Sequence, residues 1–176
     1  MSDTAGPAEQ TAARRGETAA TDVRWLDERE QRAWRAFTAM HRRLIGALQR
    51  DLQRTTGLSG PDYAILVNLS EAPGGSLRAH ELGAAADWEK SRLSHHLSRM
   101  VQRGLVERRA CAHDPRYADI LLTPAGWAAI VDAAPRHVAR VREWFVDTLT
   151  PEQLDAFATA CDAISAGLAD DGAPGC

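Results

Sequence analysis

The chain has 176 residues, of which 44% are hydrophobic and 26% charged, and its formal net charge is −3. This length suits one domain, or one domain with extensions. No apolar run is long enough for a membrane span, and the first twenty residues lack the apolar core of a signal peptide. Three cysteines, at positions 111, 161 and 176, have neither paired nor metal-type spacing, which fits a reducing compartment. With Lys90 as the single lysine beside many arginines, these features predict a bacterial cytoplasmic protein.

The N-terminal third predicts a tail and two helices. Residues 1–20 are rich in Ala, Thr, Gly and charge, and this composition predicts a disordered tail. A long helix is expected from about Thr21 to Thr55, ended by Gly57, because apolar residues recur there at helical spacing. A shorter helix should begin after Ser59, since Pro61 and Asp62 suit its first turn.

Two short amphipathic helices are expected after a brief strand at Leu77. The first covers His80 to Ala86, and the second ends before Gly104, which suits a helix stop. The second helix has an apolar stripe of Leu93, Leu97, Met100 and Val101. Its opposite face has only hydrogen-bond donors and no acid: Ser91, Arg92, His95, Ser98, Arg99 and Gln102. Such a face suits the acceptor-rich, anionic groove of DNA, although an ordinary surface helix with few acids is the plainer interpretation.

A charged hairpin follows this helix. Leu105 to Ala110 and Ala118 to Leu122 read as paired strands, and Asp-Pro between them is a turn signal. The hairpin tip would present His113, Asp114 and Arg116, and an arginine on a narrow β-ribbon can enter a minor groove. A plain charged loop is the alternative. The order of helix, helix and hairpin predicts a mainly α fold with a small β-wing, a winged helix-turn-helix.

The charge distribution agrees with nucleic-acid binding despite the negative total. Between Ser76 and Ala118 there are eight basic and five acidic residues, so this segment is positive while the rest is negative. A basic module in an acidic body is typical of a groove binder. Its small excess of charge predicts that one copy alone binds weakly.

The segment resembles the winged helix of the MarR-type (multiple antibiotic resistance) transcriptional regulators. The matching residues are Ser91-Arg-Leu-Ser-His95, Arg103-Gly-Leu-Val-Glu-Arg108, Asp114-x-Arg116 and Leu122-Thr-Pro-x-Gly126, and the resemblance covers roughly Arg24 to Leu168. It implies that the second short helix enters the major groove, that Arg116 reaches the minor groove and that Asp114 steadies the wing. Pro115 departs from the family pattern, in which glycine or a polar residue is more frequent.

The expected DNA contacts divide into base readers and phosphate binders. Ser91, Arg92, His95 and Arg99, with Ser94 on the same segment, would read bases or nearby phosphates. Phosphates would be held by Arg78, Lys90 and Arg109, and His113 lies at the wing tip. The partner is therefore double-stranded operator DNA, and the protein is expected at the nucleoid.

The C-terminal region predicts two helices. Thr123 caps and Pro124 opens a long helix that Pro135 should kink or interrupt, and a capping box of Thr150 and Gln153 begins the last one. With the first long helix they carry more apolar residues than a small winged helix needs. A purely helical core is one account, and the resemblance favours a homodimer that binds a pseudo-palindrome. The expected organisation is a dimerisation region of 21–56 and 124–168, a DNA-binding domain of 59–123, and a flexible tail of 169–176.

No enzymatic activity, cofactor or metal site is predicted. The sequence has no phosphate loop, dinucleotide fingerprint or nucleophile elbow. Adjacent His95 and His96 on a helix point about 100° apart and cannot easily share an ion. Two alternatives to a ligand-responsive repressor stay open: a winged-helix protein-interaction module, and a redox-sensing regulator that uses Cys111 at the base of the wing.

A small-molecule pocket is the last expectation. The resemblance implies that small aromatic or phenolic compounds bind where the dimer helices meet the DNA-binding part, and aromatic walls with a few polar groups would suit them. The alternative is that these side chains simply fill the core. The expected lining residues are Trp34, Phe37, His41, Tyr63, Leu66 and His137.

Overall fold

The computed structural model describes residues 23–110 and 118–171 of the chain. The protein divides into two units, residues 1–41 and residues 42–176, and each is described by itself. The expected boundaries of the dimerisation region and the DNA-binding domain stay predictions.

Helix α1 covers Glu28–Thr56 and crosses from the first unit into the second. Its start is set by Asp27, whose carboxylate accepts a hydrogen bond from Glu30 N at 2.8 Å, while the Glu30 carboxylate accepts one from Asp27 N at 2.9 Å. This reciprocal pair satisfies free N–H groups of the first turn. The helix therefore begins at Glu28, seven positions after the predicted Thr21, because this pair of hydrogen bonds fixes its first turn.

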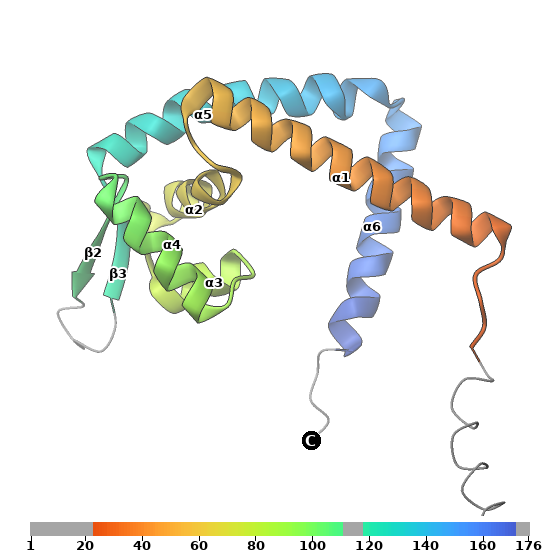
Figure 1. Cartoon of the computed structure of the whole chain (residues 1–176), viewed down its shortest axis with the longest axis horizontal. Helices are drawn as coiled ribbons and strands as arrows, with labels where there is room; N and C mark the ends of the chain where they lie inside the picture. Colours follow the sequence, from red (N-terminus) through yellow and green to blue (C-terminus); the bar gives the residue numbers. More distant parts are fainter. Residues whose placement is uncertain (1–22, 111–117, 172–176) are drawn as a thin grey trace, which may run out of the picture. The chain divides into compact units, whose positions relative to one another are not determined.

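The second unit contains three short helices and a three-stranded sheet (Figure 1). The helices are α2, Gly60–Glu71, α3, Ala79–Ala85, and α4, Lys90–Gln102, and a 3-10 turn, Pro73–Gly75, joins α2 to the first strand. The strands are β1, Ser76–Arg78, β2, Val106–Ala110, and β3, Ala118–Leu122, all antiparallel in the order β1-β3-β2. The predicted hairpin is confirmed, with Arg108 opposite Ile120.

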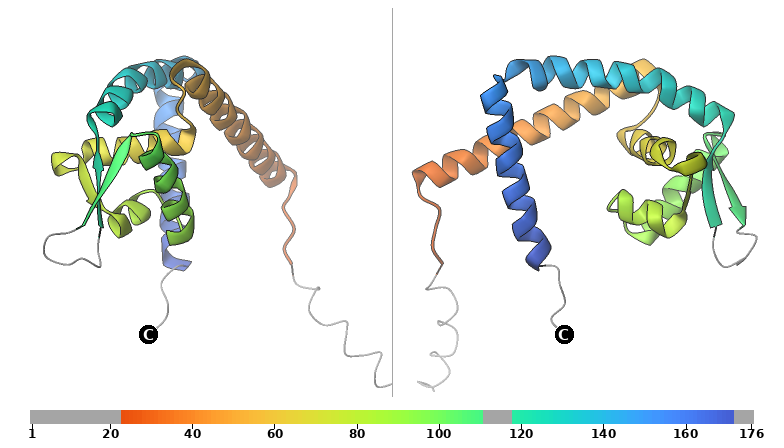
Figure 2. Two further views of the ribbon diagram at one scale, coloured as in Figure 1. Left: turned by 60° about the vertical axis from the view of Figure 1, so that its left-hand side comes forward. Right: turned by 180° about the vertical axis from the view of Figure 1, so that it is seen from behind.

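One hydrophobic core holds these elements together, and the views in Figure 2 show the helices grouped beside the strands. Most of its large side chains are almost fully buried, so they fix the position of α4 relative to the sheet. Val101, which the helical pattern assigned to this core, is instead 39% exposed. The most deeply buried members are Ile65, Leu66, Leu69, Leu82, Leu97, Met100, Val106 and Ile120.

The chain then continues through helices α5, Pro124–Trp144, and α6, Pro151–Asp171. Thr123 caps α5 as predicted, accepting a hydrogen bond from Gly126 N at 3.0 Å. Pro135, which was expected to kink or interrupt this helix, does not interrupt it, and the ribbon of α5 is curved (Figure 1). Proline leaves the carbonyl of Val131 without its helical donor, which is a known cause of bending.

Helix α5 ends before the predicted apolar pattern does. A 3-10 turn, Val146–Thr148, follows it, so Phe145 and Leu149 lie outside the helix. The predicted capping box then starts α6, with Thr150 N donating to Gln153 Oε1 at 3.0 Å and Gln153 N to Thr150 Oγ1 at 3.3 Å. Within the described residues, no helix is long and apolar enough to cross a membrane.

Candidate nucleic-acid interface

The outward face of α4 matches the face that the sequence predicted. Its polar side chains Ser91, Arg92, Ser94, His95, Ser98, Arg99 and Gln102 are all exposed. Leu93, Leu97 and Met100 are buried on the opposite side. This side of α4 therefore offers hydroxyl, imidazole, amide and guanidinium groups without a single carboxylate, which suits an acceptor-rich ligand surface.

Two arginines on this face are held by rings at its edge. The guanidinium carbon of Arg92 lies 4.5 Å from the centre of the Trp88 ring, a cation–π contact. Arg99 Nη2 lies 2.9 Å from Nδ1 of His96, and the rings of Trp88 and His96 meet edge to face at 5.2 Å. Both arginines therefore have part of their conformational freedom removed before any ligand arrives.

A buried carboxylate ties α4 to the start of α2. Asp62 is only 3% exposed, and its carboxylate accepts hydrogen bonds from Ser59 N at 2.9 Å and Arg103 Nη1 at 2.6 Å. Arg103 also donates to Gly57 O at 3.1 Å, so the end of α4 is joined to the turn between α1 and α2. His96 Nε2 lies 3.0 Å from Asp62 Oδ1, so the imidazole also contacts this carboxylate.

The charges of this cluster are fixed by its surroundings. Burial opposes ionisation of Asp62, but the hydrogen bonds from Ser59 and Arg103 outweigh it and hold the pKa of this carboxyl below its ordinary value. Burial, with help from the Arg99 and Arg103 cations, lowers the pKa of His96 against the opposing pull of Asp62. A neutral imidazole beside a charged carboxylate is the arrangement at neutral pH.

Sequence reasoning missed this cluster. Asp62 was assigned only a favourable interaction with the helix dipole, and Arg103 only a place in a motif. His96 could have been placed inside, because it lies three residues after Leu93 and four before Met100 on the apolar side. The pairing of Asp62 with Arg103, 41 positions apart, leaves no local signal.

The strand β2 is fastened to α4 by Arg108. Its Nη2 donates to Ser94 O at 2.9 Å and lies 3.5 Å from Ser98 Oγ. Arg109, a predicted phosphate binder, is exposed and pairs with Glu107 at 2.6 Å. The structure therefore gives Arg108 a supporting role and leaves Arg109 on the outer side of the strand.

The other predicted phosphate binders lie at helix starts. Arg78 ends β1, and its backbone N–H donates to the Glu81 carboxylate at 2.9 Å. This bond does not involve the side chain of Arg78, which is exposed. Lys90 is the first residue of α4 and is also exposed. The predicted wing residues His113, Asp114 and Arg116, together with Cys111, lie outside the described residues.

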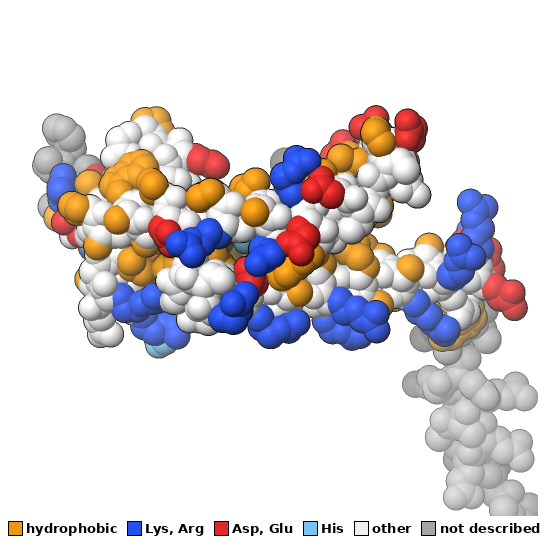
Figure 3. All heavy atoms as spheres, turned by 90° about the horizontal axis from the view of Figure 1, so that it is seen from above, with side chains coloured by type: hydrophobic (Ala, Val, Ile, Leu, Met, Phe, Trp, Pro, Cys, Tyr) orange, Lys and Arg blue, Asp and Glu red, His pale blue; other side chains and the backbone are white. Residues whose placement is uncertain are grey.

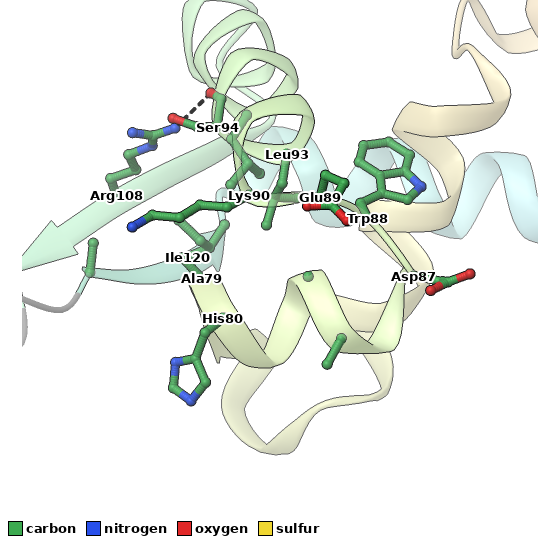
Figure 4. Close-up of a pocket in the computed structure, with 14 residues that line it drawn as sticks. Ala79, His80, Asp87, Trp88, Glu89, Lys90, Leu93, Ser94, Arg108 and Ile120 are labelled. Atoms are coloured by element: carbon green, nitrogen blue, oxygen red, sulfur yellow. Dashed lines mark hydrogen bonds between the residues drawn. The ribbon is translucent and has the colours of Figure 1, made fainter. Parts of the chain in front are cut away.

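A cavity of about 500 Å³ lies between α3, α4 and the sheet (Figure 4). Leu93, Leu97 and Ile120 supply apolar walls to the cavity. Lys90 from α4 and Arg108 from β2 add two cations to its lining. Asp87 points away from it. None of the six residues predicted for a ligand pocket lines this cavity.

Those six residues fall in both units. In the first unit, the ring of Phe37 lies 6.0 Å from that of Trp34 and 5.9 Å from that of His41. In the second, the rings of Tyr63 and His137 are 4.6 Å apart, while Leu66 is fully buried. Burial lowers the pKa of His137, and burial with the nearby Glu71 charge raises the pKa of Tyr63.

Large hydrophobic side chains are exposed along the helices outside the winged helix-turn-helix. On the face seen in Figure 3, hydrophobic side chains lie among basic and acidic groups. Helices α5 and α6 expose Trp127, Val131, Val138, Ile164 and Leu168, and in the first unit Trp25, Trp34 and Phe37 are exposed. In the described part of the chain, no three His, Cys, Asp or Glu residues gather as a metal site.

Comparisons with known proteins agree on one family. A sequence model of the MarR family matches residues 56–116. The chain is similar to AbsC, a MarR family transcriptional regulator from Streptomyces coelicolor, at 42% identity and a TM-score of 0.80, over 84% of this chain and 99% of that one. It is also similar to Sco3205 of the same organism, solved in complex with DNA, at 36% identity and a TM-score of 0.80, over 84% of this chain and 92% of that one.

A more distant structure shares the fold alone. BpsR of Bordetella bronchiseptica, whose DNA binding is regulated by 6-hydroxynicotinic acid, is 18% identical with a TM-score of 0.66. The match covers 74% of this chain and 91% of that one.

Proposed function

Because this chain belongs to the MarR family of transcriptional regulators, we propose that it is a repressor that binds a pseudo-palindromic operator as a homodimer and releases it when a small molecule binds. The observation that carries the proposal is the exposed face of α4, which has donors of several kinds and no carboxylate. A relative with 36% identity was solved in complex with DNA, which supports the same partner here.

The roles of the DNA-facing residues follow from groove chemistry. Helix α4 would lie in the major groove, where Arg92, Arg99 and His95 donate to base acceptors and Ser91 and Ser94 contact bases or phosphates. Arg78, Lys90 and Arg109 would neutralise phosphates at the edges. Arg116 would enter the minor groove, oriented by Asp114, with His113 beside it at the wing tip.

Dimerisation explains the exposed apolar side chains of the remaining helices. Monomeric proteins seldom leave many large hydrophobic groups in water, and α5 and α6 expose five of them. A dimer would present two copies of α4 to successive major grooves, about 34–36 Å apart. The small positive excess of each DNA-binding segment is then doubled on the operator.

The effector is proposed to be a small aromatic or phenolic compound. The residues proposed to contact it stay Trp34, Phe37 and His41 in the first unit and Tyr63, Leu66 and His137 in the second, and within each unit rings of this set are in contact. The cavity beside α4 is a second candidate, because its apolar walls and two cations suit a small organic anion. Release of DNA requires that the compound prefers the arrangement unsuited to the operator.

The test uses the full chain and DNA from beside its own coding region. Fluorescence anisotropy should show tight binding to a fragment that contains a pseudo-palindrome, and much weaker binding to a scrambled fragment of equal length. The logarithm of the affinity should fall linearly with the logarithm of salt concentration. Equal binding to both fragments at all salt concentrations would contradict an operator-specific regulator.

The competing functions predict different results in the same assay. A protein-interaction module would show no salt-dependent binding to any duplex. A redox sensor would lose operator binding after peroxide treatment, and Cys111→Ser would prevent that loss. We propose a regulatory rather than catalytic role, exercised at the nucleoid in the bacterial cytoplasm.

A further inference from the structure

We propose that His96 is a positioning residue for DNA binding: its neutral ring holds Arg99 on the DNA-facing side of α4, and protonation of the ring releases Arg99. The inference rests on the proposed DNA-binding function. It assigns a regulatory role to a buried residue that does not itself reach the DNA, and it predicts that operator affinity depends on pH in an unusual direction.

The contacts of the ring fix its protonation state. Arg99 Nη2 can only donate, so the 2.9 Å contact requires Nδ1 of His96 to be an acceptor without a hydrogen. The neutral ring then carries its hydrogen on Nε2, which faces Asp62 Oδ1 at 3.0 Å. This tautomer satisfies the arginine, whereas the other neutral tautomer would set two N–H groups against each other.

The position of Arg99 follows from that bond. His96 is 6% exposed and cannot move freely, because Trp88 packs edge-on against it and Asp62 lies on its other side. Arg99 is exposed, so one of its five donor hydrogens is bound to the ring and the others stay available outward. A side chain held in this way loses less conformational freedom when it binds DNA.

Protonation would break the arrangement. A second ring hydrogen must sit on Nδ1, directly opposite the guanidinium at 2.9 Å, so the bond becomes a repulsive contact between two cations. The ionised groups that face His96 are Asp62 from α2, Arg99 from α4 and Arg103 just after α4, with Arg92 beyond the Trp88 ring. Arg103 is tied to Asp62 and Gly57, so Arg99 is the group able to move away.

The ring is neutral under ordinary conditions and has a reason to titrate under acid conditions. Burial and the nearby arginines lower its pKa, which keeps the ring neutral at pH 7. Its Nε2 lies buried 3.0 Å from the Asp62 carboxylate, whose charge favours the protonated ring. A charged ring would gain attraction to Asp62 and would lose Arg99.

The direction of the effect separates His96 from the exposed histidines. A positive charge added on the outer face of α4 would strengthen binding to the phosphates. Protonation of His96 should weaken it, because Arg99 becomes free to leave its position. Immobilising one long side chain is worth about a 2- to 10-fold change in affinity.

The experiment measures operator affinity of the full chain at constant ionic strength, from pH 8 down to the pH at which NMR shows the His96 ring to be protonated. His96→Asn keeps an acceptor at the place of Nδ1 but cannot be protonated there, and His96→Leu removes the acceptor. Over this range, we expect wild-type affinity to fall about 2- to 10-fold relative to His96→Asn. A constant ratio across this range would overturn the inference.

Two controls separate positioning from general damage. At pH 8, His96→Leu should bind less tightly than wild type, yet it should cause no further loss in an Arg99→Ala background. His95→Gln should leave the difference between wild type and His96→Asn in place. An equal loss with His96→Leu in both backgrounds would show that His96 acts only through the stability of the fold, and the inference would fail.

A measurement without DNA distinguishes this inference from the proposed function. Titration of the His96 ring by NMR should give a higher pKa in Arg99→Ala than in wild type, because the cation and its bond to Nδ1 are gone. An unchanged pKa overturns the His96–Arg99 coupling even if operator binding is normal. Failure to bind any operator, with the pKa raised as expected, would contradict the proposed function and leave the coupling supported.

Discussion

Gly126 is the position where one added carbon should do the most damage. It lies in the first turn of α5, and a Cβ built there would be 2.0 Å from Leu105 O and 3.1 Å from Leu105 C. Ordinary carbon–oxygen contacts are about 3.3–3.6 Å. Gly126→Ala therefore requires α5 and the chain before β2 to separate by more than about 1 Å.

The contact cannot relax by moving a side chain, because its partner is backbone. Leu105 O also receives Thr123 N at 3.3 Å and Thr123 Oγ1 at 3.2 Å, so a shift of Leu105 weakens the cap of α5 as well. Overpacking costs about 1–3 kcal/mol, and a clash with backbone should lie at the upper end of this range. The higher helix propensity of alanine offsets up to about 1 kcal/mol of that cost. We therefore expect the free energy of unfolding to fall by about 2–3 kcal/mol.

The assay is urea unfolding followed by circular dichroism, at matched protein concentrations because dimerisation also contributes to stability. The control is Gly167→Ala in α6, where no atom lies within 4 Å of the added carbon. That exposed helical site should gain up to about 1 kcal/mol. If the Gly126→Ala variant were as stable as the wild type, the close approach between α5 and Leu105 would be refuted.

Three further predictions concern DNA binding and pH. Arg116→Ala should weaken operator binding by about 1–3 kcal/mol in a mobility-shift titration without changing the melting temperature, and unchanged affinity would remove Arg116 from the interface. Lys90→Ala should weaken all duplexes equally and reduce the salt slope by about one unit, whereas His95→Ala should relax preference among operator variants; a uniform loss in both would contradict this division. The free energy of unfolding should fall from pH 7 to pH 5, because the unfolded chain takes up a proton at an ordinary histidine pKa, near 6.5, before buried His96 does. Below pH 4 a second loss of stability is expected, because Asp62 protonates at a higher pH in the unfolded chain than in the folded one. If urea unfolding showed that the stability increases on acidification, both assignments would be contradicted.

Local signals account for the elements that the sequence predicted well. Ser59 and Thr123 cap their helices through side-chain oxygens a few residues from the N–H groups they satisfy. The strand Ala118–Leu122 has the predicted bounds, and the brief strand expected at Leu77 is centred on that residue. Caps, turn residues and apolar periodicity are properties of five to ten neighbouring residues, so they can be read without a structure.

The errors arose where solvent or tertiary packing outweighed a local rule. Pro135 was expected to kink or interrupt α5, and the helix continues through it without a break. Val101 follows the apolar period of α4 but stays 39% exposed, while polar His96 is buried. A periodic pattern gives the side of a helix that can be buried, and only the neighbouring elements decide how far the buried area extends.

The sequence by itself determined the winged helix-turn-helix and the donor-rich face of α4, because both follow from short patterns in one continuous segment. Only the tertiary structure decided that Asp62, from the start of α2, meets His96 of α4 and Arg103 just after it. It also showed why the residue at position 126 is glycine, since the atom that excludes a side chain belongs to Leu105, distant in sequence. Contacts between residues tens of positions apart depend on the packing of whole elements, and no local pattern encodes them.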